Sequence, residues 1–207
     1  MSLLEALATT LLPSLCAACG RPAAAEAPIC ATCGGRLENA SPLRGAGPAG
    51  IDRAWSAAPY EGVPRDLVAA LKFRALLPVA GLMAERINHL APPHLLSGEV
   101  VPVPTARARG FRRGFDPAGE LAAALAAGAG LPLRPCLARR GAGRQVGRRR
   151  AERLGRPPRI EAAGVVPRSC ILVDDVLTTG STLSAAARAL REAGALRVVA
   201  VTFARRL

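Results

Sequence analysis

The residues that most constrain the fold form one stretch near the C-terminus, residues 170–182, with the sequence CILVDDVLTTGST. An apolar run opens this stretch, and it is short enough for a buried strand. Two carboxylates, Asp174 and Asp175, stand at the end of the run. A small polar loop comes next, and the Ala-, Leu- and Arg-rich residues 183–193 predict a helix. A strand, a tight loop and a helix in this order predict an α/β fold.

The polar loop after the carboxylates has the groups that hold a phosphate. A helix N-terminus presents unpaired backbone N–H groups and the positive end of a dipole, a glycine lets the backbone approach an anion, and hydroxyls add donors. The loop residues are Thr178, Thr179, Gly180, Ser181 and Thr182. Because two carboxylates would repel a bare anion, we expect them to accept hydrogen bonds from ribose hydroxyls or to help hold a divalent ion, which indicates a sugar phosphate. An ordinary turn with capping residues is the alternative, but capping needs only one such residue.

Two C-x-x-C pairs near the N-terminus predict a structural zinc site. The pairs are Cys16 with Cys19 and Cys30 with Cys33. Four thiolates at this spacing suit a tetrahedral Zn²⁺, and they leave no open coordination position for catalysis. The residues between the pairs are rich in Pro and Ala and cannot form a core alone, so zinc would be the core of this module. A redox dithiol would explain one pair and leave the other unexplained.

The positive charge is concentrated in arginine. The chain has 28 basic residues and a formal net charge of +13, and Lys72 is its sole lysine. Arginines cluster in residues 107–113 and 139–159. Such clusters favour a polyanionic partner, and both pyrophosphate and nucleic acid qualify.

The first arginine cluster follows a predicted strand at 99–103. Ligands of open α/β sheets lie beyond the carboxyl ends of the strands, and Arg side chains suit the oxygens of a pyrophosphate. We therefore expect Pro104, Arg107 and Arg113 to belong to a pyrophosphate-binding loop, with a basic surface loop as the alternative. Lys72 is a second cation that could lie beside a phosphate, although a solvated charge at a helix end fits it equally well.

Changes in composition predict three parts. Residues 1–40 hold a short amphipathic helix and the cysteine module, residues 41–52 are a Pro- and Gly-rich linker, and residues 53–207 form the main domain. No secretory signal and no apolar run long enough to span a bilayer is evident, so we expect a cytoplasmic protein without a membrane span. In that compartment cysteines are metal ligands or core residues rather than disulfides.

The apolar periodicity predicts the remaining elements. Helices are expected at 3–12, from 64 onward, at 78–90, at 118–127 and at 183–193. Strands are expected at 53–60, 99–103, 131–137, 160–166, 171–173 and 197–203.

Residues 170–182 resemble the phosphoribosyl-pyrophosphate (PRPP) motif of type I phosphoribosyltransferases, and the chain as a whole resembles the ComF family. In that family a four-cysteine zinc ribbon precedes a phosphoribosyltransferase-type domain. The matching segments are the two cysteine pairs and residues 60–65, 71–73, 101–104, 113–115, 145–147, 152–153 and 170–182. Three places depart from the usual pattern: Asp116 and Pro117 replace Asn-Gln, Ala142 replaces Thr, and an Asn is missing at 154–155.

The resemblance implies a Rossmann-like type I phosphoribosyltransferase fold with a small N-terminal zinc ribbon. It implies that Asp174 and Asp175 bind the ribose hydroxyls of PRPP, that residues 178–182 bind its 5′-phosphate, and that Mg²⁺ accompanies the pyrophosphate. The reaction would be phosphoribosyl transfer to an acceptor. The family also implies a link to competence and DNA uptake. The alternative is a non-catalytic protein of the uptake machinery that reuses the fold to bind single-stranded DNA, or a protein partner through the ribbon.

Overall fold

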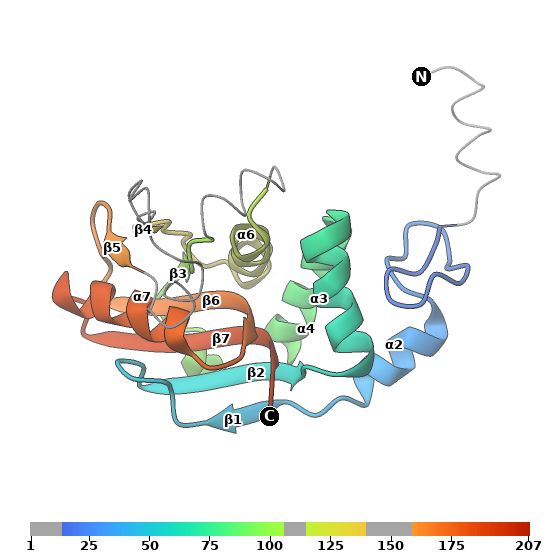
Figure 1. Cartoon of the computed structure of the whole chain (residues 1–207), viewed down its shortest axis with the longest axis horizontal. Coiled ribbons are helices and arrows are strands. Elements are labelled where there is room, and N and C mark those ends of the chain that lie inside the picture. The colour runs from blue at the N-terminus through green and yellow to red at the C-terminus, as the bar shows by residue number, and fades with distance from the viewer. Residues whose placement is uncertain (1–13, 106–114, 140–158) are drawn as a thin grey trace, which may run out of the picture.

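The structure of this protein is a computed structural model that describes residues 14–105, 115–139 and 159–207. Its centre is a five-stranded sheet in the order β1-β2-β7-β6-β3, with β1 at the lower edge in Figure 1. The strands are β1 (Leu43–Gly45), β2 (Arg53–Pro59), β3 (Glu99–Pro102), β6 (Ser169–Leu177) and β7 (Arg197–Arg205). β1 is antiparallel to β2, and the other neighbouring pairs are parallel. The predicted α/β class is confirmed.

Helices cover both faces of this sheet, with α3 (Gly62–Arg74), α4 (Pro78–Leu90) and α6 (Pro117–Ala129) on one face and α7 (Ser181–Glu192) on the other. α2 (Ala31–Glu38) lies beside the sheet and packs against α3, and a 3-10 turn forms at Pro93–Leu95. In β6, Ile171 and Val173 pack into the cluster formed with α3, α4 and α6, whereas Cys170 and Leu172 pack into the cluster formed with α7. Successive strand residues point to opposite faces, so a strand covered on both faces must be apolar throughout. None of the described helices is long and apolar enough to cross a membrane.

Three strand predictions differ from the structure. The strand expected at 160–166 ends at Ala162. β6 continues to Leu177 instead of ending at the apolar run, because its pairing with β7 extends to Arg205. The strand expected at 131–137 is absent. Pro132 and Pro135 lack the N–H that a strand needs, and only an isolated bridge joins Leu133 to Val100. A separate two-stranded sheet forms from β4 (Leu137–Arg139) and β5 (Ile160–Ala162).

Residues 41–52, interpreted from the sequence as a linker, are fixed to the main sheet. They supply β1, and Asp52 accepts the N–H of Val198 at 2.9 Å and pairs with Arg191 at 2.6 Å. Pro48 lies against the loop before α7, where Gly180 adopts a left-handed φ of +74°. A Cβ at Gly180 would lie within 2.8 Å of the Cβ of Pro48 and nearer still to its Cγ. The turn after β6 therefore depends on a glycine for both conformation and space.

We expect Gly180→Ala to lower the free energy of unfolding by about 1–3 kcal/mol, because a left-handed backbone disfavours alanine and the new methyl group overlaps Pro48. Urea denaturation measures this, followed by the fluorescence of Trp55, the sole Trp, which is 1% exposed. Gly81→Ala in α4 is the matched control, since its Cβ would have no neighbour within 4 Å. It should keep or raise stability. Equal stabilities of Gly180→Ala and wild type would contradict this packing.

Candidate functional site

The two adjacent carboxylates at the end of β6 point in different directions. Asp174 lines a small pocket of about 30 Å³ together with the loop and the start of α7. Asp175 is 3% exposed and contacts Lys72 of α3, whose Nζ lies 2.8 Å from Asp175 Oδ1. Alternation along the strand explains the difference, because neighbouring side chains leave a strand on opposite sides. The sequence prediction treated the pair as one unit, and the structure gives its members different neighbours.

Four of the five loop residues predicted to hold a phosphate line the pocket beside Asp174. Its lining comprises Asp174, Val176, Leu177, Thr178, Gly180, Ser181, Thr182 and Leu183. Thr179, the fifth predicted residue, does not line it; it is exposed and donates from Oγ1 to Ser181 Oγ at 3.2 Å. α7 begins at Ser181, so the N–H groups of its first turn, which have no partner within the helix, face this loop. An anion is favoured there by these donors and by the helix dipole.

The ionisation of Asp174 is disfavoured in this protein. Burial raises the pKa of Asp174 well above its usual range, and the adjacent Asp175 carboxylate raises it further. Lys72 and the N–H of Asp175, which donates to Asp174 Oδ1 at 2.9 Å, act in the opposite direction. A carboxyl group shifted by burial and by a like charge at a pocket is typical of functional sites.

The second oxygen of Asp175 has no hydrogen-bond partner in the described structure. Asp175 Oδ2 is buried, whereas Oδ1 is held by Lys72. An unpaired buried acceptor is costly in a folded protein and is common where a ligand supplies the missing donor. Lys72 was predicted to meet a pyrophosphate, and in this structure its contact is with Asp175.

Only part of the predicted pyrophosphate loop falls within the described residues. Pro104 follows β3, as expected, whereas Arg107 and Arg113 lie outside the described residues. Thr105 Oγ1 donates to Asp116 Oδ1 and so joins the two described ends of this segment. Asp116 occupies the N-cap position of α6, but its side chain makes no capping hydrogen bond. The Thr105–Asp116 bond was not predicted, because nothing in the sequence pairs the two residues.

The four predicted zinc ligands lie together. The sulfur atoms of Cys16, Cys19, Cys30 and Cys33 lie within 4.8 Å of one another, and Cys19 Sγ is 3.8 Å from Cys30 Sγ. Zn–S bonds of about 2.3 Å in a tetrahedron place neighbouring sulfur atoms about 3.8 Å apart. The cluster therefore fits a tetrahedral metal ion such as zinc. In each C-x-x-C turn the N–H that follows the second cysteine bonds back to the first, from Gly20 to Cys16 O and from Gly34 to Cys30 O, both at 2.9 Å.

The cysteine thiols are electrostatically unequal. Burial raises the pKa of Cys33 to about 12, and the neighbouring thiols add to this shift. The backbone and the guanidinium of Arg21 lower the pKa of Cys19 to about 6. A bound divalent cation favours thiolates outright, so these four ligands need the cation in order to ionise together.

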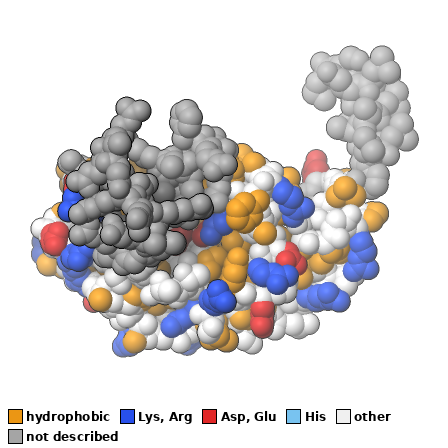
Figure 2. All heavy atoms as spheres, viewed as in Figure 1, with side chains coloured by type: hydrophobic (Ala, Val, Ile, Leu, Met, Phe, Trp, Pro, Cys, Tyr) orange, Lys and Arg blue, Asp and Glu red, His pale blue; other side chains and the backbone are white. Residues whose placement is uncertain are grey.

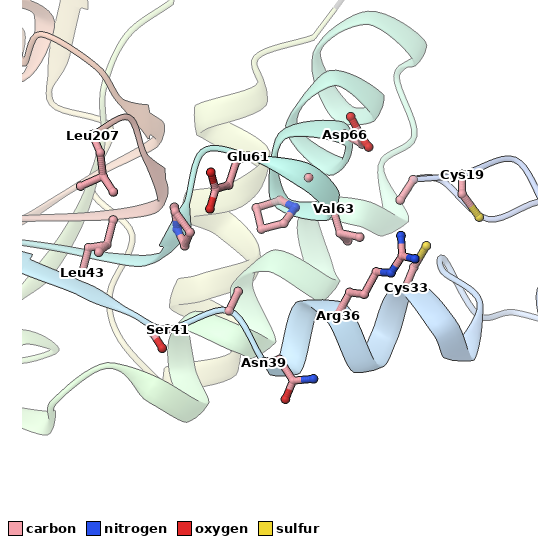
Figure 3. A pocket seen from close by; sticks show the side chains of 15 residues that line it. Cys19, Cys33, Arg36, Asn39, Ser41, Leu43, Glu61, Val63, Asp66 and Leu207 are labelled. Atoms are coloured by element: carbon pink, nitrogen blue, oxygen red, sulfur yellow. The ribbon is translucent and has the colours of Figure 1, made fainter.

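A larger pocket of about 610 Å³ lies between the cysteine module and the start of α3 (Figure 3). Cys19, Cys33 and Arg36 line it on the side of the module and of α2, and Glu61 and Asp66 line it from the connection into α3 and from α3 itself. None of its lining residues belongs to the pocket beside Asp174. This pocket is therefore separate from the predicted sugar-phosphate site.

We expect one zinc per chain in the purified protein and almost none in Cys16→Ser or Cys33→Ser, because each of these variants removes one ligand from a tetrahedral site. Elemental analysis of the purified variants measures the metal content. Cys136→Ala is the control, since Cys136 is buried in the main domain and belongs to no such cluster among the described residues. Full zinc content in both serine variants would contradict the assignment.

The match to a known family covers the residues that line the pocket beside Asp174. Residues 112–207 match the family model described as Phosphoribosyl transferase domain. This range includes β6, the loop and α7, whereas the cysteine module, α3 and Lys72 lie before it. No curated protein matches the chain. The C-terminal part of the chain therefore carries a phosphoribosyl transferase domain within an α/β fold, preceded by a four-cysteine cluster.

Proposed function

We propose that this protein binds PRPP together with Mg²⁺ and transfers its phosphoribosyl group to an acceptor. The observation that carries the proposal is the shared pocket, in which a carboxylate at the end of β6 faces a Thr/Ser/Gly loop and a helix N-terminus. A phosphate needs the second feature, and a sugar hydroxyl needs the first. The match of residues 112–207 to the phosphoribosyl transferase model supports this reading.

The roles follow from the chemistry of the groups. Residues 178–182 would hold the 5′-phosphate, and Asp174 and Asp175 would accept the ribose hydroxyls. The unpaired Oδ2 of Asp175 supports this role, because a hydroxyl would satisfy it. Pro104, Arg107 and Arg113 would meet the pyrophosphate, which arrives as its magnesium complex and is part of the substrate.

The reaction would break the bond between C1′ and the pyrophosphate oxygen and form a bond between C1′ and the acceptor. Positive charge develops on the ribose ring in such a displacement, and nearby carboxylates stabilise it. The leaving pyrophosphate carries away the electron pair of the broken bond, so the protein needs no covalent nucleophile. Its task is to fix the ribose and to neutralise the leaving group. We include Asp174 and Asp175 in the catalytic set for this reason.

We further propose that the protein is of the ComF type, with zinc held by the four cysteines and a role in competence and DNA uptake. In this reading residues 1–40 are the ribbon module and residues 53–207 the transferase-like domain. The pocket beside Cys19 and Arg36 offers the ribbon a place to contact a protein partner. A cytoplasmic location agrees with six cysteines that form no disulfide.

A second candidate function is binding of single-stranded DNA without catalysis. The net charge of +13 favours it. Aromatic residues make up only 3% of the chain, however, and single-strand binders usually stack bases on aromatic side chains. Figure 2 shows basic side chains spread over the described part of one face, with acidic and apolar ones between them. The sugar-phosphate site is therefore the better supported function.

Mg²⁺ with PRPP at about a hundred times its dissociation constant should stabilise the wild type by roughly 2.7 kcal/mol, and Asp174→Asn should lose most of this gain.

The raised pKa of Asp174 also predicts how the stability of the ligand-free protein changes with pH. A carboxylate whose pKa is higher in the folded than in the unfolded state costs no stability below its unfolded pKa. The cost grows as the pH rises above the unfolded pKa and is complete above the folded pKa. Free Asp174→Asn should therefore be more stable than free wild type at neutral pH, and the difference should shrink in acid.

Thermal unfolding with and without Mg–PRPP measures the stabilisation by the ligand, and thermal unfolding of the ligand-free proteins at neutral and acid pH measures the pH dependence. Asp66→Asn on the exposed side of α3 is the control variant for both. No ligand shift in the zinc-loaded wild type would rule out the proposed function. A shift of equal size in wild type and Asp174→Asn would place the ligand elsewhere.

A further inference from the structure

One ion pair joins α3 to the end of β6, and its two partners are unequally buried. Lys72 Nζ lies 2.8 Å from Asp175 Oδ1, and the side chains are 27% and 4% exposed. No other cation of the described residues forms an ion pair with Asp175, and the neighbouring charge on its own strand is the carboxyl group of Asp174. Burying a carboxylate is costly unless a cation is paired with it. Lys72 is therefore the residue that compensates the charge of Asp175.

The position of Lys72 is itself fixed by packing. Leu67, Val68 and Leu71 are fully buried on the same helix, so the backbone that carries Lys72 cannot shift freely. Just beyond Lys72, Arg74 Nη2 donates to Ala17 O in the first cysteine turn, and Ala75 ends the helix in a left-handed conformation. The ammonium group is therefore presented to β6 from a rigid element, which is the condition for precise positioning.

We propose that Lys72 is a positioning residue of the sugar-phosphate site, which holds Asp175 by Oδ1 so that Oδ2 is offered to a ribose hydroxyl. The inference rests on the proposed function and adds a residue that lies outside the matched transferase range. It also replaces the simpler expectation that Lys72 touches the pyrophosphate. The two roles differ in what they require of the ligand, because positioning acts through the ribose and direct contact acts through the pyrophosphate.

A double-mutant cycle with two ligands separates these roles. The affinities of Mg–PRPP and of ribose 5-phosphate, which lacks the pyrophosphate, are measured by calorimetry for wild type, Lys72→Met, Asp175→Asn and the double variant. Lys72→Met should weaken both ligands by a similar factor, about tenfold or more, and should add little in the Asp175→Asn background. Lys72→Arg should retain most of the affinity, because it keeps the charge.

Thermal unfolding of the same variants tests the ion pair without any ligand. Lys72→Met should lower the melting temperature by roughly 10 °C, because it leaves a buried charge uncompensated, and the double variant should recover most of the loss. Arg65→Met on the same helix is the control, since its pair with Asp66 is exposed and should matter little.

Three results would overturn the role of Lys72. The first is a loss of affinity in Lys72→Met for Mg–PRPP but not for ribose 5-phosphate. The second is a double variant whose loss of affinity equals the product of the losses in the two single variants. The third is a double variant with a lower melting temperature than Lys72→Met. A wild type that binds neither ligand would overturn the proposed function together with this role. A wild type that binds both ligands and shows any of the first three results would overturn the role of Lys72 alone.

Discussion

Two adjacent carboxylates lie near the C-terminal end of β6 in a largely buried position, and the rest of the site is arranged around their charge. Asp175 has its charge compensated by Lys72 at 2.8 Å. Among the described residues no cation forms an ion pair with Asp174, and burial together with the Asp175 carboxylate raises its pKa. Stability alone would favour neutral residues at both positions. Functional sites commonly keep groups that cost stability, because the same groups bind the ligand.

Helix α3 connects the two chemically distinct parts of the molecule. Lys72 reaches the acidic end of β6, and Arg74, two residues later, reaches the carbonyl of Ala17 between two of the cysteines. The apolar face of α3, which includes Leu67, Val68 and Leu71, is buried in the main core. A metal ion in the cysteine cluster would fix the turn that Arg74 contacts, so the module and the proposed sugar-phosphate site would share one rigid support. The segment 41–52 adds a second connection, because it places Pro48 against Gly180.

The sequence predicted most of the architecture, because the relevant signals are local. The helix at 78–90 was predicted with the bounds it has in α4, since Pro78 starts it and its apolar residues follow the helical period. The loop before α7 and the grouping of the four cysteines were predicted from local residue types and spacing. The contact of Lys72 with Asp175 could not be predicted in this way, because it depends on how α3 packs on a distant strand. The length of β6 was missed for a related reason: two acidic residues appear to end an apolar run, although tertiary burial allows the strand to continue.

The central claim is that the end of β6 and the start of α7 form a binding site for PRPP. A crystal structure of the zinc-loaded protein with Mg²⁺ and PRPP tests it most directly. The claim predicts the 5′-phosphate at the backbone N–H groups of residues 178–182 and a ribose hydroxyl within hydrogen-bond distance of Asp174. It also predicts that Asp175 Oδ2 gains a donor while Lys72 keeps its contact with Oδ1. Density for the ligand away from this loop, or a loop that stays empty at saturating ligand, would contradict the account.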